Sequence, residues 1–300
     1  MTFDQLVAFH AVATRGGFSA AAAHLHKSQP AVTKLVQSLE AALGLVLFDR
    51  AAYRAALTDA GRLLLERVEG LLANAEAVRR FARVLGGAAE PVVRIVLEAV
   101  TPLSYVLRAL HQVRAVFPSV RFELRTERLS GALEALRESS ADLAITTGHG
   151  VDARTMVSRP FVGVRIIPVA HRDHPLAAIA GPVPASELRE HAQVVVTDSA
   201  RGELSQTLNV LEAGLQWTVT DVAAKLEIIE AGLGWGGLPE HVVAPGIAAG
   251  QLVALDVREF DVHTIELFLV RRRDDAAGPV TQALWARLAD PEGAQPARPA

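Results

Sequence analysis

Three short stretches near the amino end carry apolar residues at the spacing of an α-helix. The first begins at Phe3, and the sequence Arg15–Gly17 ends it. The second is rich in alanine, and we expect Ser19 to cap its amino end. The third follows a short turn and ends at Gly44. The pattern therefore predicts three small helices that pack around one core.

The third of these helices has an apolar and a polar face. We expect Ser28 to cap it and Pro30 to lie in its first turn, where a missing N–H has no helical partner to lose. The residues predicted to face the core are Val32, Leu35, Val36 and Leu39. The residues predicted to face outward are Gln29, Thr33, Lys34 and Gln37. Such outward side chains can bond to phosphates and base edges. The alternative is a purely structural helix, because every amphipathic helix has a polar outer face.

A basic hairpin is predicted after the third helix. Two short apolar segments flank a tip that carries Arg50 and Arg54. An alanine-rich helix, a tight turn, a Ser-capped helix and a basic hairpin are together typical of a winged helix-turn-helix, which docks its second helix in the major groove. The segment 1–57 has five basic residues, Arg15, Lys27, Lys34, Arg50 and Arg54, against three acids, Asp4, Glu40 and Asp49. This segment is therefore about +2, whereas the whole chain has a formal charge of −3.

One long helix is predicted next, from Thr58, which can cap it, to Leu85. Some 28 residues would reach about 40 Å. Its narrow apolar seam consists of Leu64, Val68, Leu71, Leu72, Ala75, Val78, Phe81 and Leu85. A seam of this kind favours pairing with a second copy of the helix. The alternative is a core helix of the domain that follows.

Strand-like and helical segments alternate from Pro91 onward. The order strand, helix, strand, helix, strand up to Thr147 predicts a parallel sheet with helices on both faces. A second set of strands follows, with helices near Pro184–His191 and Glu203–Glu212 and a final helix around Val280–Leu288. Two similar halves predict a hinged cleft, in which ligands bind beyond the carboxyl ends of the strands.

Residues at those strand ends are the candidate ligand contacts. The loop after the first strand precedes a helix that begins near Pro102, and a helix amino end with a free hydroxyl favours an anionic group. The candidates are Val100, Thr101, Arg128, Ser130, Thr147, Thr197 and Ser199. The alternative is that these hydroxyls only cap helices.

Composition removes several classes of function. The chain has 300 residues, of which 50% are hydrophobic, and it has no cysteine. Disulfides, thiolate nucleophiles and cysteine-based metal sites are therefore excluded. No run approaches 18 apolar residues and the amino end lacks the pattern of a signal peptide, so we expect no membrane contact and a cytoplasmic location. We expect neither a cofactor nor a bound metal.

Three other patterns have ordinary explanations. Gly232, Gly234 and Gly237 match G-x-G-x-x-G but follow a helix, so Gly232 is interpreted as a helix stop. His171 and His174 are three residues apart, but no cluster of Asp, Glu or His accompanies them in a helical register that suits a metal, so they are expected on a loop that leaves a strand. The sequence Arg271–Arg273 ends a strand and is expected to be a solvated edge, with a phosphate contact as the alternative.

The amino-terminal pattern closely resembles the winged helix-turn-helix of the LysR-type transcriptional regulators. The likeness extends over about Phe3 to Leu65 and is carried by FSAAAAHLHKSQPAVTKLVQSLEAALGLVLFDR and LTDAG. It continues more loosely in SGALEALRESSADLAI, AHRDHPLA and IIEAGLGWGGLPEHVV. The family commonly has Ser and Arg where this chain has Thr33 and Lys34, and Lys replaces a bidentate fork with a point charge.

The resemblance implies a fold of the α/β class: an N-terminal winged helix-turn-helix, a long linker helix, and a two-subdomain effector domain like the periplasmic binding proteins. We expect the winged domain over 1–58, the linker and dimerisation helix over 59–88, and a disordered tail over 291–300. The effector domain is expected over 90–290, with subdomain I at about 90–162 and 266–290 and subdomain II at about 163–265.

The function predicted is that of a DNA-binding regulator whose action a small-molecule effector modulates. The residues expected at the DNA are Ser19, Ser28, Gln29, Pro30, Thr33, Lys34, Gln37, Arg50 and Arg54. The expected partners are double-stranded DNA, the effector, further copies of the chain in a dimer or tetramer, and RNA polymerase. The alternatives are an α/β enzyme, for which no G-x-S-x-G or cysteine is present, and a solute-binding protein, which the missing signal peptide opposes.

Overall fold

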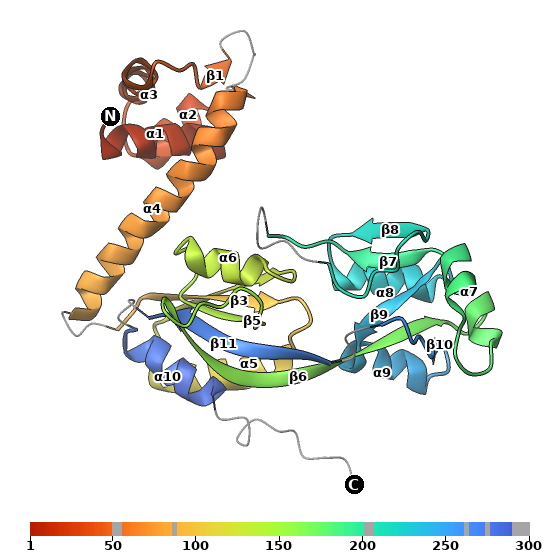
Figure 1. Cartoon of the computed structure of the whole chain (residues 1–300). Coiled ribbons are helices and arrows are strands. Elements are labelled where there is room, and N and C mark those ends of the chain that lie inside the picture. Colours follow the sequence, from red (N-terminus) through yellow and green to blue (C-terminus); the bar gives the residue numbers. More distant parts are fainter. Residues whose placement is uncertain (50–55, 86–88, 201–206, 261–263, 274–276, 290–300) are drawn as a thin grey trace. The chain divides into compact units, whose positions relative to one another are not determined.

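A computed structural model describes residues 1–49, 56–85, 89–200, 207–260, 264–273 and 277–289 (Figure 1). The chain forms two compact units, Met1–Arg79 and Arg80–Ala300. The predicted hairpin tip with Arg50 and Arg54 and the predicted tail lie outside the described residues. Within the described segments, no helix is both long enough and apolar enough to cross a lipid bilayer.

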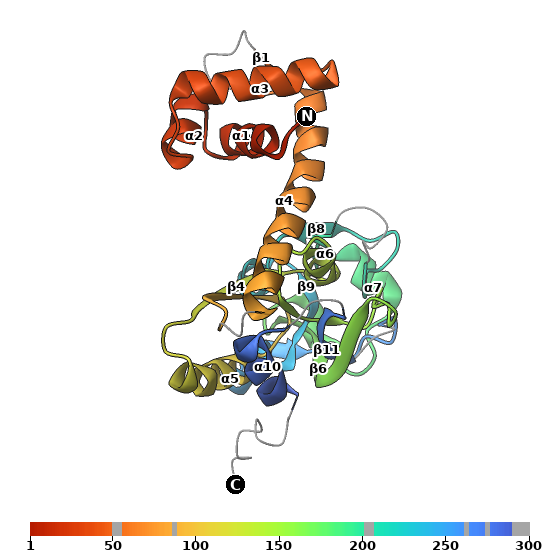
Figure 2. The same ribbon diagram turned by 90° about the vertical axis from the view of Figure 1, so that its left-hand side faces the viewer.

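The smaller unit contains the predicted helices and hairpin. Its elements are α1 (Phe3–Thr14), α2 (Phe18–His24), α3 (Gln29–Leu43), β1 (Phe48–Asp49), β2 (Ala56–Leu57) and the larger part of α4 (Asp59–Leu85), which continues past the boundary at Arg79. β1 and β2 pair antiparallel, which confirms the hairpin. Figure 2 shows α3 lying across α1 and α2. The cap predicted for α2 is wrong: Gly17 holds the N-cap position without a side-chain bond, and Ser19 lies inside the helix.

The core of this unit is small and largely aromatic and aliphatic. Val32, Val36 and Leu39 of α3 are at most 1% exposed, as the helical spacing predicted, and Leu35 packs against them while partly exposed. The ring of Phe48, at the start of the hairpin, meets Phe9 of α1 with centroids 5.6 Å apart. The hairpin and the three helices therefore share one core, which fixes the direction of α3.

The apolar seam of α4 is divided between two environments. Thr58 caps the helix by accepting a hydrogen bond from the N–H of Gly61 at 3.0 Å, as predicted. Val68 is buried in the core of the smaller unit, so the first part of the seam is already covered. Farther along, Leu71 is 44% exposed and Val78 is 68% exposed. The side chains of the last seam residues lie outside the described part.

The larger unit is built on a mixed sheet with strand order β4-β3-β5-β11-β6-β9-β7-β8, and β10 pairs with β6. The strands are β3 (Val92–Glu98), β4 (Arg121–Glu127), β5 (Leu143–Thr147), β6 (Met156–His171), β7 (Gln193–Val196), β8 (Gln216–Val219), β9 (Trp235–Pro239), β10 (Leu252–Ala254) and β11 (Thr264–Arg272). The helices are α5 (Leu103–Val116), α6 (Gly131–Arg137), the 3-10 turn η1 (Pro175–Ala178), α7 (Ala185–Glu190), α8 (Val222–Glu230), α9 (Glu240–Ala248) and α10 (Pro279–Leu288).

The first half of this unit has the predicted parallel arrangement. β3 pairs parallel with both β4 and β5. Successive residues of β3 face opposite sides of the sheet, because Ile95 belongs to the core with α5 and α10 and Val96 to the core with α6. Helices therefore cover both faces, as an α/β sheet requires.

One long strand, β6, belongs to both halves of the unit (Figure 1). Its residues up to Arg165 pair with β11, and its residues from Ile166 pair with β9. The subdomain boundary expected at 162–163 therefore falls inside a continuous strand. In the second half, β7 and β8 run parallel, and α8 and α9 pack on the same core.

Several sequence-based expectations about this unit need correction. Residues 207–212 are not helical, so the helix predicted near Glu203–Glu212 is wrong over its described part. Arg272 is not a solvated edge: it is 9% exposed and donates to the carbonyls of Leu136 and Ala141, at the end of α6. The helix α9 and the strand β10 were not anticipated.

Candidate functional site

The outer face of α3 is a candidate DNA-contacting surface. Ser28 caps the helix by accepting a hydrogen bond from the N–H of Ala31, and Pro30 lies in its first turn, as predicted. The helix ends at Gly44, whose φ of 66° is a left-handed conformation that glycine adopts without strain. The exposed residues on this face include Gln29, Lys34 and Gln37.

Two hydroxyls beside this face are held by Gln29. The hydroxyl of Ser19 on α2 donates to the side-chain oxygen of Gln29 at 3.2 Å. The hydroxyl of Thr33 donates to the backbone oxygen of Gln29 at 3.0 Å, which leaves Thr33 half-buried. These bonds join outward residues of α2 and α3 into one polar surface, which includes the exposed Lys34.

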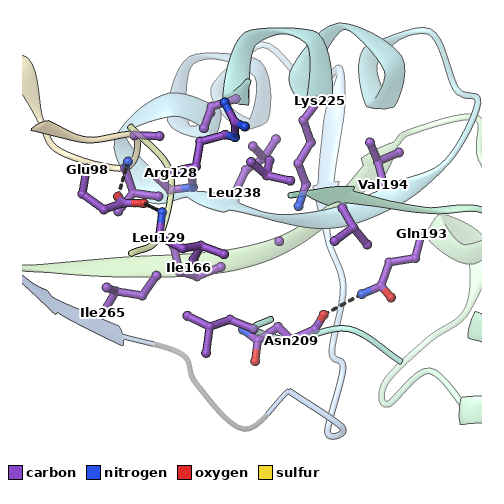
Figure 3. A pocket seen from close by; sticks show the side chains of 18 residues that line it. Glu98, Arg128, Leu129, Ile166, Gln193, Val194, Asn209, Lys225, Leu238 and Ile265 are labelled. Carbon is purple, nitrogen blue, oxygen red and sulfur yellow. Dashed lines mark hydrogen bonds between the residues drawn. The ribbon is translucent and has the colours of Figure 1, made fainter. Parts of the chain in front are cut away.

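The larger unit contains a pocket between its two halves (Figure 3). The empty space within it, counting the part open to solvent, is about 680 Å³. From the first half come Glu98, Ala99, Val100, Arg128, Leu129 and Ile265. From the second half come Ile166, Gln193, Val194, Val195, Val196, Leu208, Asn209, Val222, Lys225, Gly237, Leu238 and Pro239. The lining is mostly apolar, with a few polar groups that could orient a ligand.

Glu98 is a buried carboxyl group at one end of the pocket. It is 3% exposed, and its oxygens accept hydrogen bonds from the N–H groups of Val100 at 2.6 Å and Leu129 at 3.0 Å. Burial raises the pKa of Glu98 to about 7, against the opposing effect of those N–H groups. Both carboxylate oxygens of Glu98 thus bind the backbone of neighbouring loops.

Lys225 is a buried ammonium group at the centre of the pocket. It is 8% exposed, and burial lowers its pKa to about 8. Its head lies against Gly236, where an added Cβ would meet Cε at 2.9 Å and Nζ at 3.2 Å. Glycine at this position therefore leaves the space that the lysine occupies.

A clasp of hydrogen bonds, formed by residues 128–131 of the first half and 197–200 of the second, joins the two halves beside the pocket. Arg128 donates from Nε to the carbonyl of Thr197 at 2.6 Å and from its backbone N–H to Oγ of Ser199 at 2.8 Å. The N–H of Ser130 donates to Oδ1 of Asp198 at 3.1 Å. Gly131 is packed so closely that an added Cβ would overlap Oγ of Ser199.

Two of the seven predicted ligand contacts, Val100 and Arg128, line the pocket. Thr101 follows the end of β3 and Thr147 is the last residue of the neighbouring strand β5; for their buried hydroxyls the described residues supply no hydrogen-bond partner. Ser130, Thr197 and Ser199 belong to the clasp, and the last two use their hydroxyls within the protein.

Sequence reasoning missed most of the pocket, including Lys225. One signal was present, because Lys225 lies four residues before the buried Ile229 and therefore on the inward face of α8. Outside the pocket, Gly232 has a left-handed φ of 74° just after α8, which confirms its interpretation as a helix stop. His174 caps η1 by accepting from the N–H of Leu176, and the described residues contain no cluster of metal-ligating side chains.

Comparison with known proteins agrees with this architecture. Residues 3–62 match the family model of the bacterial regulatory helix-turn-helix protein, lysR family, and residues 86–291 match that of the LysR substrate binding domain. The chain is 31% identical over 277 residues to the probable HTH-type transcriptional regulator YhaJ of Escherichia coli strain K12, which covers 91% of each protein.

Solved structures share the fold at low identity. Full-length CbnR in complex with its target DNA has a TM-score of 0.61 at 20% identity, covering 96% of this chain and 99% of that one. A full-length OxyR variant from Pseudomonas aeruginosa has a TM-score of 0.60 at 20% identity, covering 96% of this chain and 94% of that one. With two family models that together span most of its length, the chain belongs to the LysR-type transcriptional regulators, which join a helix-turn-helix domain to an effector-binding domain.

Proposed function

We propose that this regulator binds duplex DNA by laying α3 in the major groove. The observation that supports this proposal is that α3 presents polar residues to solvent, while its opposite face is buried in the core of the smaller unit. Gln29, Thr33, Lys34 and Gln37 would meet base edges and phosphates, with Ser19, Ser28 and Pro30 beside the backbone. Arg50 and Arg54, in the hairpin tip, would add phosphate contacts.

The regulator acts as an oligomer through α4. The exposed Leu71 and Val78 continue an apolar seam whose earlier residues are buried against the helix-turn-helix core. A second copy of the helix would cover them and would set two copies of α3 on successive half-sites of a pseudo-palindromic operator. Dimer or tetramer formation follows from this role, and RNA polymerase is the partner through which transcription would respond.

The pocket between the two halves of the larger unit is the effector site. A ligand that contacts Val100 and Arg128 on one side and residues of β7 and α8 on the other would bias the closure of the two halves. The described lining residues are mostly apolar and include no serine, threonine or histidine that could form a nucleophile–base pair, which favours binding over turnover, so we expect no enzymatic activity.

A mobility-shift titration tests the DNA-binding role. The full-length protein should retard the intergenic DNA upstream of its own gene at low salt, with an affinity that falls as salt rises. Lys34→Ala should weaken the complex without lowering the melting temperature. Protein that fails to retard that DNA at low salt would contradict the proposal.

Thr101→Ala tests the position of the effector site. Removal of this unpartnered hydroxyl should weaken the response to effector and leave DNA affinity within twofold of the parent. Ser104→Ala, on the exposed side of α5, serves as the matched control. Equal loss of DNA affinity and effector response in Thr101→Ala would refute the assignment.

A further inference from the structure

The pocket contains a buried cation for which the described part of the chain provides no counter-charge. Lys225 is 8% exposed, yet no hydrogen bond, ion pair or ring contact to any described residue involves its ammonium group. Figure 3 shows the side chain descending from α8 with its nitrogen in the space between Val194 and Leu238. A buried charge is ordinarily paired, because desolvation without a partner is costly. Lys225 thus has no counter-charge among the described residues, and the pocket beside it has room for an anionic group of a ligand.

The surroundings of Lys225 indicate the rest of the ligand. Around it lie aliphatic side chains from both halves, among them Ile166, Val194, Leu238 and Ile265 (Figure 3). An ion without an apolar portion would leave these aliphatic side chains in contact with water. A molecule with an anionic end and a compact apolar body would cover them and pair with the lysine.

The other two charged residues of the lining, Glu98 and Arg128, each bond to backbone groups of the protein. Both oxygens of Glu98 accept backbone N–H groups, and Nε of Arg128 donates to the carbonyl of Thr197. Lys225 is a point charge that suits a single carboxylate, whereas a phosphate group would call for further donors around it. Lys225 is thus the charged residue of the described lining that no hydrogen bond or ion pair holds in place.

We propose that the effector of this regulator is a small monocarboxylate with an apolar body, and that its carboxylate pairs with Lys225. This proposal rests on the pocket being the effector site. It adds the chemical class of the ligand and the residue that selects it. Rejection of neutral isosteres follows, because an uncharged ligand would leave the buried ammonium unpaired.

Matched pairs of carboxylates and carboxamides test the proposal on the full-length protein. The probes are benzoate with benzamide, 3-phenylpropionate with 3-phenylpropanamide, and hexanoate with hexanamide. The readout is the melting temperature followed by tryptophan fluorescence, which reports on the larger unit because it holds all three tryptophans, Trp217, Trp235 and Trp285. At least one carboxylate should raise the melting temperature saturably, and its amide should not.

Lys225→Met should weaken the binding of that carboxylate roughly 30-fold or more, as loss of a buried charge partner does. Arg159→Met is the matched control: it removes the same charge from an exposed position of β6 and should leave carboxylate affinity unchanged. Acetylation with acetic anhydride gives a second readout that needs no variant. Lys225 should be protected by the carboxylate, while the exposed Lys27 and Lys34 report unprotected reactivity in the same sample.

The results of these experiments test the anionic ligand separately from the DNA-binding role. Amides that stabilise the protein as well as carboxylates do would keep the pocket as a ligand site but overturn the anionic ligand. The proposal also falls if no carboxylate raises the melting temperature above its amide, or if Lys225→Met binds the carboxylate as tightly as the parent. The DNA-binding role is judged by the mobility shift alone.

Discussion

Replacement of Lys225 by Met should stabilise the protein when no effector is bound. Burial holds the pKa of Lys225 at about 8, against 10.5 for an exposed lysine. Since each pKa unit corresponds to about 1.4 kcal/mol, the buried charge lowers the free energy of unfolding by about 3 kcal/mol at pH 7. Met has a similar length and no charge, so it should recover about 1–3 kcal/mol of that amount. For a unit of this size, each kcal/mol raises the melting temperature by roughly 2–4 °C.

The gain should depend on pH in a defined direction. The folded-state pKa of Lys225 lies below its unfolded value, so at low pH folding forces a charged amine into an apolar site. This penalty is fully present below about pH 8, and it falls as pH rises through 10.5, above which neither state is protonated. The advantage of Lys225→Met over the parent should therefore be largest near pH 7 and should shrink through that window.

Urea denaturation at pH 7 and pH 10, followed by tryptophan fluorescence, measures both quantities on the larger unit. Arg159→Met controls for the loss of one positive charge and should change stability by less than about 0.5 kcal/mol at either pH. The reasoning would be refuted if Lys225→Met were less stable than the parent at pH 7. It would also be refuted if the difference were the same at both pH values.

Three further predictions concern DNA, the clasp and a helix cap. Lys34→Ala should reduce the slope of log affinity against log salt by about 0.9, and an unchanged slope in the salt titration would argue against a phosphate contact. Gly131→Ala should separate the clasp and lower the melting temperature. The decrease in melting temperature should be smaller in a Ser199→Ala background, where the opposing Oγ is absent, and strictly additive effects would contradict this contact. Glu90→Ala should lower the free energy of unfolding by about 1–3 kcal/mol, because the Glu90 carboxylate accepts hydrogen bonds from two N–H groups at the start of α10, at 3.0 and 3.1 Å. An unchanged urea midpoint would show that this cap does not stabilise the protein.

Local patterns predicted the helices and the hairpin pairing of the smaller unit, although not the cap of α2. Ser28, Pro30 and Gly44 mark the ends of α3 by backbone chemistry that acts within a few residues, and the spacing of Val32, Val36 and Leu39 identifies its buried face. The same holds for the parallel strands β3, β4 and β5, whose apolar runs are interrupted by helical periods. In each case the signal and the structure it determines lie close together in sequence.

The pocket could be predicted only in part, because it is assembled from distant segments. Strand-end reasoning found Val100 and Arg128, since the carboxyl ends of parallel strands meet at one edge. It could not find Ile166 or Lys225, which enter through a strand shared by both halves and through the inner face of α8. Nor could it foresee that Arg272 turns inward, because its carbonyl partners lie more than 130 residues earlier.

The position of β11 in the sheet has a consequence for biosynthesis. β11 pairs with β5 on one side and with β6 on the other, and α10 then packs in the same core as α5. The first half of the larger unit thus lacks the strand that joins β5 to β6 until Thr264–Arg272 has left the ribosome, although its other strands are made more than 90 residues earlier. During translation β5 presents an unpaired apolar edge for the time needed to synthesise the whole second half. Truncations that end before residue 264 should therefore recruit chaperones or aggregate, even though they contain every residue of β3, β4 and β5.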